Sequence, residues 1–321
     1  MSESAAGTGD DAAPSGSTVA GYALPRLLAS NDDPGVAAWR AELPQVVATV
    51  LTQWSLVASA PFSPGGSAAW VAPVQDRDGT ELVLKVAWAH EESRDEAAGM
   101  TAWQGRGAAR VLRSELQGPT SLLLMEQVLP GTPLADLLTW PERDEVAAGL
   151  LREMWFRPEA VLPAAEAAQF RPLSHMCAWW ADEAQARADD GRSPLPRDVI
   201  DRGLALFRLL PLEWDGDQVL LATDFHPSNV LARGEGAARE WVLIDPKPYV
   251  GDPHYDLLQH MLNDPERVTS QPGAFAERMA GLTGLDPVRA RQWLFARCVQ
   301  EAGVMDGAAQ AALGLAADGV A

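Results

Sequence analysis

Lysine is nearly absent from this 321-residue chain. Only Lys85 and Lys247 carry an ammonium group, whereas the other 23 of the 25 basic residues are arginine. The two cations are not equivalent, because guanidinium is a planar fork and ammonium is a compact charge on a flexible stem. A chain that otherwise uses arginine should keep lysine where a compact ammonium is needed, so both lysines are candidate site residues.

Cysteine and long apolar runs are also scarce. Cys177 and Cys298 lie far apart, without the spacing of a zinc site, a redox pair or a disulfide framework, which favours reduced and buried thiols. No segment approaches the roughly 18 uncharged apolar residues of a membrane span. The N-terminus lacks the basic and apolar regions of a signal peptide. The sequence therefore predicts a soluble, cytoplasmic protein with no membrane partner.

The chain has fewer basic than acidic residues. Acidic residues number 44 against 25 basic ones, which gives a net charge of −19. This balance argues against a nucleic-acid partner or an anionic membrane surface. A cationic small molecule fits it, although acidity on its own also serves solubility. The length and the 47% hydrophobic content suffice for two domains or lobes.

One stretch carries acids at two predicted strand ends. The apolar run 219–222 leads to Asp224, Asn229 follows five residues later, and the apolar run 241–244 leads to Asp245. Carboxylate and amide oxygens suit Mg²⁺ bound together with phosphates. The same order and spacing occur in the catalytic and metal-binding loops of kinases. Each residue alone fits ordinary turn chemistry, but the three together predict a phosphoryl-transfer centre.

The first half of the chain predicts a small sheet. Apolar runs at 69–74 and 81–88 flank a turn at 76–79, which is typical of a β-hairpin. Lys85 lies inside the second run, where a buried ammonium is costly unless it faces anionic groups in a cleft. Lys85 is therefore a candidate phosphate-binding residue.

Two backbone segments are candidates for contact with a nucleotide. One is a glycine-containing turn before the hairpin, which would fold over phosphates or serve only as a turn. The other follows a strand expected at 121–125 and would be the hinge that meets an adenine base and opens the second lobe. The residues are Gly65, Gly66 and Ser67 in the turn, and Glu126, Gln127 and Val128 in the hinge.

A helix is predicted from about residue 91 to residue 104. Glu96 lies on its main stripe and would pair with Lys85, as in the ion pair that positions the phosphate-binding lysine of kinases. Glu91 and Glu92 compete for this role, and the stripe also fits a solvated helix face.

The chain divides into three predicted parts. Residues 1–20 are small, polar and acidic and predict a disordered tail. Residues 21–128 form a nucleotide-binding N-lobe that opens with a helix after Asp33, and residues 129–321 form a mostly helical C-lobe. The last residues, 307–321, are expected to fray. The predicted fold class is α+β, with two lobes.

These residues together resemble the aminoglycoside/hydroxyurea antibiotic resistance kinases, of the streptomycin 6-phosphotransferase type. The resemblance covers about residues 54–301 and lies in the motifs SPGGSAAWVAP, LVLKVAW, LLLMEQVLPGTPL, TDFHPSNVL and IDPKPYVGDPHYD. It implies a two-lobed, protein-kinase-like fold and an ATP- and Mg-dependent transfer of phosphate to a hydroxyl group.

The resemblance also implies roles for the candidate residues. Asp224 would orient the acceptor hydroxyl as the catalytic residue, Asn229 and Asp245 would bind Mg²⁺, and Lys85 with Glu96 would hold the ATP phosphates. Ala222-Thr223 stands where the wider family usually has His-Gly, which leaves the acceptor open. His226 matches a loop histidine of the family and is expected to be structural.

The acceptor is predicted to be a small cationic or sugar-like molecule. Clustered carboxylates raise the local concentration of cations, and we expect six acids to border the acceptor, with Arg297 as the main base among them. The acids are Asp182, Glu183, Asp252, Asp256, Glu301 and Asp306. Asp256 would equally serve to hold the loop after Asp245. A metabolic sugar or amino-sugar kinase is the alternative within this class, and a catalytically silent nucleotide-binding pseudokinase is the alternative outside it.

Overall fold

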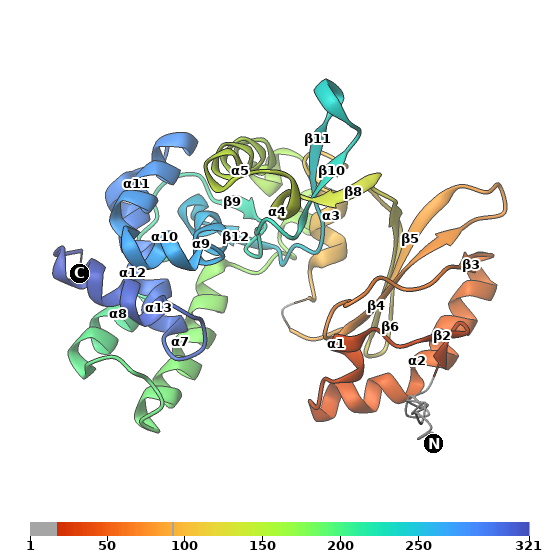
Figure 1. Ribbon diagram of the computed structural model, residues 1–321, viewed down its shortest axis with the longest axis horizontal. Helices are drawn as coiled ribbons and strands as arrows, with labels where there is room; N and C mark the ends of the chain where they lie inside the picture. Colours follow the sequence, from red (N-terminus) through yellow and green to blue (C-terminus); the bar gives the residue numbers. More distant parts are fainter. Residues whose placement is uncertain (1–17, 92, 321) are drawn as a thin grey trace, which may run out of the picture. The chain divides into compact units, whose positions relative to one another are not determined.

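The computed structural model describes residues 18–91 and 93–320, which fall into two compact units (Figure 1). The first unit runs to Ala89 and includes Leu112–Glu126, and the second comprises His90–Val111 and Gln127–Ala321. Most of the predicted tail, residues 1–17, lies outside the described residues. Residues 18 to 20 do not belong to a tail, because Thr18–Val19 pairs with Tyr22–Ala23 as a small antiparallel ladder.

The first unit is a sheet covered by one long helix. Its five-stranded sheet has the order β3-β4-β5-β7-β6, and β4, β5 and β7 pair antiparallel. The elements are β1 (Thr18–Val19), β2 (Tyr22–Ala23), α1 (Arg26–Ala29), α2 (Pro34–Trp54), β3 (Val57–Ala58), β4 (Ala69–Gln75), β5 (Glu81–Trp88), β6 (Val111–Gln117) and β7 (Thr120–Glu126). The predicted hairpin at 69–88 is therefore confirmed.

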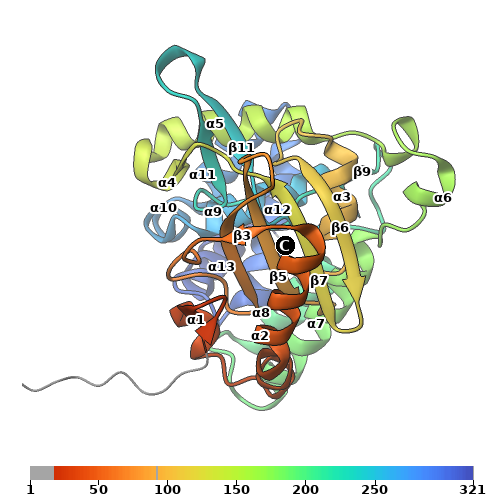
Figure 2. The same ribbon diagram turned by 90° about the vertical axis from the view of Figure 1, so that its right-hand side faces the viewer.

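Helix α2 begins where the sequence predicted. The Asp33 carboxylate accepts hydrogen bonds from the N–H groups of Gly35 and Val36 at 2.8 and 3.1 Å, and Pro34 occupies the first turn, where its missing N–H costs nothing. Figure 2 shows α2 running across one face of the sheet. Its apolar stripe joins Leu84 and Val86 of β5 in one buried cluster.

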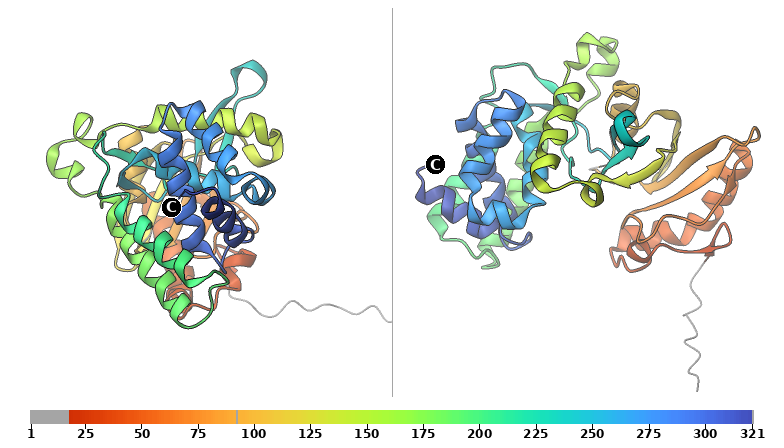
Figure 3. Two further views of the ribbon diagram at one scale, coloured as in Figure 1. Left: turned by 90° about the vertical axis from the view of Figure 1, so that its left-hand side faces the viewer. Right: turned by 45° about the horizontal axis from the view of Figure 1, so that its top comes forward.

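The second unit is mostly helical. Its helices are α3 (Glu96–Trp103), α4 (Leu134–Leu137), α5 (Trp140–Met154), α6 (Ala164–Ala167), α7 (Leu173–Asp189), α8 (Arg197–Leu209), α9 (Leu257–Leu262), α10 (Pro265–Ser270), α11 (Pro272–Thr283), α12 (Pro287–Glu301) and α13 (Ala308–Ala317), with 3-10 turns η1 (Pro158–Ala160), η2 (Gly236–Ala238) and η3 (Pro253–Asp256). Figure 3 shows the blue C-terminal helices packed on the green pair α7 and α8 from two directions. None of the described helices combines the length and the apolar character needed to cross a membrane.

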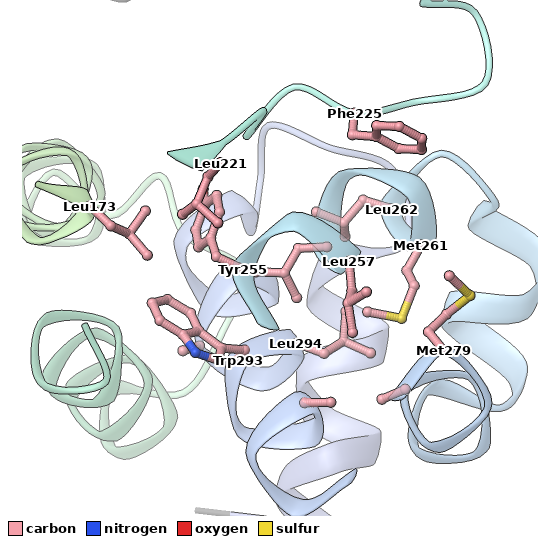
Figure 4. Packing of buried hydrophobic residues seen from close by; sticks show 14 of the residues in the cluster. Leu173, Leu221, Phe225, Tyr255, Leu257, Met261, Leu262, Met279, Trp293 and Leu294 are labelled. Carbon is pink, nitrogen blue, oxygen red and sulfur yellow. The ribbon is translucent and has the colours of Figure 1, made fainter. Parts of the chain in front are cut away.

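Aromatic rings fill the centre of the second unit's core. Trp293 of α12 meets Tyr255 of η3 edge to face at 5.2 Å and Phe207 of α8 at 6.0 Å. Figure 4 shows Leu221, at the end of a strand, directed into this same core. Burial of such rings contributes both apolar area and a preferred geometry. The core therefore fixes the end of the strand that carries the predicted catalytic acid.

Short strands of the second unit position the predicted site. Strand β10 (Val230–Arg233) pairs antiparallel with β11 (Glu240–Leu243) and with β8 (Pro130–Pro133). Strand β9 (Val219–Leu221) pairs antiparallel with β12 (Tyr249–Gly251). The hairpin expected to return the chain from Asn229 to Asp245 is thus present.

Three details differ from the predictions. Helix α3 begins at Glu96 and not near residue 91. Segment 90–111 clusters with the second unit although it was expected in the N-lobe, because Trp103 is buried and its indole donates to the Met154 carbonyl at 3.0 Å. The chain end was expected to fray, but α13 forms and buries Leu315 against the core.

Candidate active site

The turn that follows β9 presents Asp224. Its neighbour Thr223 has a left-handed backbone, with φ at 49°, which is uncommon for a residue with a Cβ. Asp256 holds this turn: its carboxylate accepts hydrogen bonds from the N–H groups of Ala222 and Thr223 at 3.1 and 2.8 Å and from the Trp155 indole at 2.9 Å. The direction of Asp224 is therefore set by a buried carboxylate from η3.

The Asp224 side chain is accessible and has a cation beside it. It is 19% exposed, and the Lys247 ammonium lies 3.2 Å from its Oδ2. Nε2 of His226 lies 4.0 Å from Oδ1. A partly exposed carboxylate held in one direction can accept a proton from a hydroxyl group that approaches it.

Asn229 and Asp245 follow from the hairpin register. Val230 pairs with Leu243, and the next N–H along, that of Ile244, donates to the Asn229 carbonyl at 2.8 Å. Asp245 comes directly after Ile244 and has φ at 55°. The Asn229 amide also donates to the Asp224 carbonyl at 3.4 Å. The structure therefore brings Asp224, Asn229 and Asp245 together within one loop system.

His226 lies inside this loop as a neutral ring. Burial lowers the pKa of His226 below its ordinary value, although the charges of Asp224 and Asp245 oppose the effect. Its Nδ1 finds no hydrogen-bond partner among the described residues, and its carbonyl accepts from the Asn229 N–H at 2.9 Å. The residue supports the loop through its backbone.

The donor set fits a magnesium ion that keeps other ligands. Asn229 could supply an amide oxygen and Asp245 a carboxylate oxygen, both of which are hard ligands. Among the described residues no group of three or more His, Cys, Asp and Glu side chains gathers as a metal site. Mg²⁺ is usually held by one or two protein oxygens and completes its shell with water and phosphate oxygens, so two ligands are sufficient.

Lys85 is buried within the first unit. It is 7% exposed and lies opposite Val71 of β4 and Leu123 of β7 in the middle of the sheet. The residues on either side of it, Leu84 and Val86, belong to the core under α2. Because successive side chains of a strand point to opposite faces, the Lys85 side chain points to the other face of the sheet.

Glu96 is buried within the second unit, where it opens α3 and is 1% exposed. Of its competitors, Glu91 pairs with Arg171 at 2.7 Å, and Glu92 lies outside the described residues. Glu91 therefore already has a cationic partner, Arg171. Because Lys85 and Glu96 belong to different units, their pairing stays a prediction.

The glycine-containing turn is anchored at both ends. The Pro64 carbonyl accepts from the Leu27 N–H at 3.1 Å, and the Ser67 carbonyl accepts from the Asn31 amide at 3.0 Å. A Cβ on Gly65 would lie 2.5 Å from the Pro25 side chain, and φ at this residue is +75°, so glycine is required there. This requirement gives Gly65 a structural reason for its presence that does not depend on a nucleotide, whereas a Cβ on Gly66 would meet nothing closer than 3.8 Å.

The hinge residues coincide with the division between the units. Glu126 ends β7 in the first unit, and Gln127 and Val128 open the second. Their contact with a base stays a prediction.

Two of the acids expected to border the acceptor are structural. Asp252 is fully buried and accepts hydrogen bonds from His254, Arg289 and Trp293 at 2.6 Å each. Burial acts to raise its pKa, but these hydrogen bonds outweigh burial and hold the pKa below the ordinary value. Asp256 is equally buried under the catalytic turn. Neither carboxylate is available to a substrate.

The sequence left the roles of two functional residues undecided. One is Asp256, which anchors the turn. The sequence allowed it either to hold a loop or to contact the substrate. The other is Lys247 beside Asp224, which only the scarcity of lysine indicated. No spacing rule could place either contact, because Asp256 reaches back to Ala222 across more than thirty residues.

The site has a carboxylate at a strand end, an amide five residues later and a second carboxylate at the exit of a hairpin. This arrangement defines a phosphotransferase of the kinase class. The fold agrees with this class. It is similar to Plasmodium vivax ethanolamine kinase, with a TM-score of 0.53, 11% identity and 90% of each chain covered. It is also similar to a choline/ethanolamine kinase family protein from Mesorhizobium loti, with a TM-score of 0.54, 16% identity and coverage of 88% of this chain and 93% of that one. The predicted kinase-like α+β fold is confirmed.

The chain belongs to the aminoglycoside/hydroxyurea antibiotic resistance kinase family, which residues 53–307 match. It is 37% identical over 265 residues to the hydroxyurea phosphotransferase of Kitasatospora aureofaciens, covering 80% of this chain and 72% of that protein. It is 33% identical over 270 residues to the streptomycin 6-kinase of Streptomyces griseus, covering 82% and 83%, and 31% identical over 272 residues to that of Streptomyces glaucescens, covering 83% of each. The predicted family is thus confirmed.

Proposed function

We propose that this protein transfers the γ-phosphoryl group of ATP to a hydroxyl group of a small antibiotic. The observation that carries the proposal is the convergence of Asp224, Asn229 and Asp245 at the ends of β9 and of the β10–β11 hairpin. Asp224 takes the acceptor proton, since it is the partly exposed acid of the three whose direction the Asp256 network fixes. The need for ATP favours action in the cytoplasm.

The remaining candidate residues hold the nucleotide and the metal ion. Asn229 and Asp245 bind Mg²⁺, which neutralises charge on the phosphates when bound. Lys85 pairs with the ATP phosphates, and Glu96 keeps its ammonium in place. Backbone groups of 65–67 and 126–128 contact the phosphates and the adenine. Support for Lys85 comes from its burial in a sheet face that α2 does not cover, where an ammonium needs anionic partners.

A streptomycin-type aminoglycoside is the first candidate acceptor. Two relatives that cover more than four fifths of this chain are streptomycin 6-kinases, and a net charge of −19 favours capture of a cation. Hydroxyurea is the second candidate. It is favoured by the 37% identity to a hydroxyurea phosphotransferase, which exceeds the identity to either streptomycin 6-kinase.

The experiment that tests the function is a panel assay. Streptomycin, other aminoglycosides, amino sugars, nucleoside antibiotics and hydroxyurea are each offered with ATP and Mg²⁺, and ADP release is measured together with the mass of the product. We expect one antibiotic to gain a single phosphate group, and turnover to stop when Mg²⁺ is chelated. Phosphorylation of amino sugars alone would assign the protein to metabolism.

Thermal unfolding separates an enzyme from a silent binder. A pseudokinase would gain stability with nucleotide and leave ATP intact with every acceptor, whereas an enzyme should respond to ATP plus Mg²⁺ and consume it. The Asp224→Asn variant, which retains the metal ligands, provides the background rate.

A further inference from the structure

Lys247 is the second of only two lysines, and it lies in the catalytic loop system. Its ammonium is 3.2 Å from Oδ2 of Asp224 and the side chain is 30% exposed. The opposing carboxylate is 19% exposed. This pair is therefore accessible from solvent and lies on the acid that accepts the hydroxyl proton. A purely structural ion pair could use arginine, which this chain has at 23 of its 25 basic positions, and would not need lysine.

The backbone of Lys247 is held by the residues that precede Asp224. Its N–H donates to the Ala222 carbonyl at 2.9 Å, and its carbonyl accepts from the Thr223 hydroxyl. Pro246 and Pro248 stand on either side, and both restrict the local dihedral angles. The backbone of Lys247 is thus fixed, and its side chain extends to Asp224.

Pro248 is itself packed in place. A Cβ on Gly99 of α3 would lie 2.2 Å from the Pro248 ring, so helix and proline are in direct contact. Preorganised charges of this kind need no rearrangement when charge develops in a reaction.

We infer that Lys247 is a second catalytic cation, whose ammonium bridges Asp224 and the oxygens of the phosphoryl group in transfer, and that the Thr223 hydroxyl positions it. The inference rests on the proposed function. In that reaction the acceptor oxygen forms a bond to the γ-phosphorus while its proton passes to Asp224. The bond from the γ-phosphorus to the β–γ bridging oxygen breaks, and its electron pair leaves with ADP. Charge spreads over the three equatorial oxygens, next to which the Lys247 ammonium stands.

This inference explains why residue 223 is a threonine. Its φ of 49° would suit glycine better. Glycine, however, has no hydroxyl to donate to the Lys247 carbonyl. A side chain with a hydroxyl group at this strained position therefore coincides with the contact that holds the lysine.

Substitution of Lys247 tests the role in turnover. We expect Lys247→Met to lower kcat by roughly 10²–10³, the usual scale for loss of one electrostatic stabiliser of a transition state, while the KM for ATP changes far less. Lys247→Arg should not restore kcat, because the planar fork cannot replace a compact ammonium. Arg197→Met, which removes an exposed cation paired with Asp189 and Asp201, is the matched control and should behave as wild type.

Thr223 gives a test that keeps the lysine. Thr223→Val preserves the shape and the branched Cβ and replaces the hydroxyl with a methyl group, so we expect a smaller loss in kcat than in Lys247→Met and a lower thermal midpoint, because the Lys247 carbonyl loses this donor. Thr223→Ser, which retains the hydroxyl, should recover most of the activity. The Thr223→Val, Lys247→Met double variant should lose less than the product of the single effects, because both act through the same ammonium.

Nucleotide binding supplies a readout that does not depend on an acceptor. Calorimetry compares ADP with Mg²⁺ alone and ADP with Mg²⁺ and aluminium fluoride, which mimics the phosphoryl group in transfer. We expect aluminium fluoride to tighten ADP binding in the wild type, and Lys247→Met to lose this gain while binding of ADP with Mg²⁺ is retained.

The outcomes separate the inference from the function. If Lys247→Met keeps a kcat within threefold of wild type or keeps the aluminium fluoride gain, the inference is wrong and the proposed function stands. The inference is also wrong if the variant folds but loses ADP binding itself, or if Thr223→Val turns over like wild type. A wild type that neither binds ADP with Mg²⁺ nor consumes ATP overturns the proposed function, and the inference with it.

Discussion

Thr223 and Asp245 share a feature that is rare for residues with side chains. Both have left-handed backbones, with φ at 49° and 55°, and both stand where a strand delivers a site residue. This conformation costs roughly 1–2 kcal/mol per residue and persists only where surrounding contacts impose it. Here the Asp256 carboxylate and the hairpin register supply those contacts. Two of the five described non-glycine residues with positive φ therefore lie in this loop system.

Asp224→Asn tests the acid itself. The amide keeps the shape of the side chain but cannot accept the hydroxyl proton, so we expect the fold and ATP binding to persist while turnover falls by roughly 10² or more. Steady-state kinetics and nucleotide titration measure the two properties. Asp217→Asn, at an exposed carboxylate of the same unit, is the control. Turnover near the wild-type level would remove Asp224 from the mechanism.

Asp256 links the stability of the fold to pH. Burial raises the pKa of Asp256 to about 6 from its ordinary value of 3.8, although the hydrogen bonds from Trp155, Ala222 and Thr223 oppose the change. The folded state thus binds this proton more tightly than the unfolded chain. The contribution to stability is present below about pH 4 and is lost as pH rises through 6. A difference of about two pKa units corresponds to roughly 3 kcal/mol.

The Asp256→Asn variant removes this titration and faces three N–H donors with only one acceptor oxygen. We expect lower stability and lower turnover from a loosened catalytic turn. We also expect the gap in unfolding free energy between wild type and variant to shrink as pH rises from 4 to 7, measured by urea denaturation. A gap that widens over this range would contradict the sign of the shift.

Strand β5 explains how a lysine can be buried in a sheet. Leu84 and Val86 turn toward the core under α2, and the alternation of a strand turns Lys85 to the other face. The strand is central in the sheet, so its backbone groups are satisfied on both sides by β4 and β7. The side chain is therefore presented from a rigid element.

This setting predicts different results for two substitutions of Lys85. Lys85→Ala should weaken ATP use, and Lys85→Arg should not restore it, because the larger planar guanidinium cannot replace a compact ammonium at a buried strand position. The KM for ATP and the thermal shift with ATP plus Mg²⁺ measure the effect. Arg77→Lys, at an exposed position of the adjoining turn, is the control. Full rescue by arginine would mean that the site needs only positive charge.

Four of the six acids expected to border the acceptor already have partners within the protein. Asp252 and Asp256 are buried in structural networks. Asp182 pairs with Arg208 at 2.8 Å, and Glu301 pairs with Arg297 at 2.6 Å. The net charge of −19 nevertheless remains, and a field of this sign favours the approach of cations.

The salt dependence of catalysis tests this field. We expect kcat/KM for streptomycin, a cationic acceptor, to fall as salt rises from low to several hundred millimolar, because charges on the surface are screened over about 10 Å at 0.1 M. The KM for ATP with Mg²⁺ should change less. Hydroxyurea, which is neutral, is the control acceptor, and its kcat/KM should not depend on salt. If the best acceptor proves neutral and indifferent to salt, the acidity serves solubility alone.

The sequence by itself determined the elements and the core of the site. The Asp33 cap and first-turn proline set the start of α2, and alternation and turn residues set the β4–β5 hairpin. Asp224, Asn229 and Asp245 were found together because a turn and a hairpin bring near neighbours in the chain into contact. Such signals are local, so one sequence carries them in full.

Only the tertiary structure decided which charges are available. Asp252 and Asp182 look alike in the sequence, yet one is buried among hydrogen bonds and the other is exposed beside Arg208. The anchoring of Ala222 by Asp256 and the approach of Lys247 to Asp224 depend in the same way on how η3 and the loop before β12 pack. Burial and pairing between distant segments are properties of the whole packed core, and no local pattern encodes them.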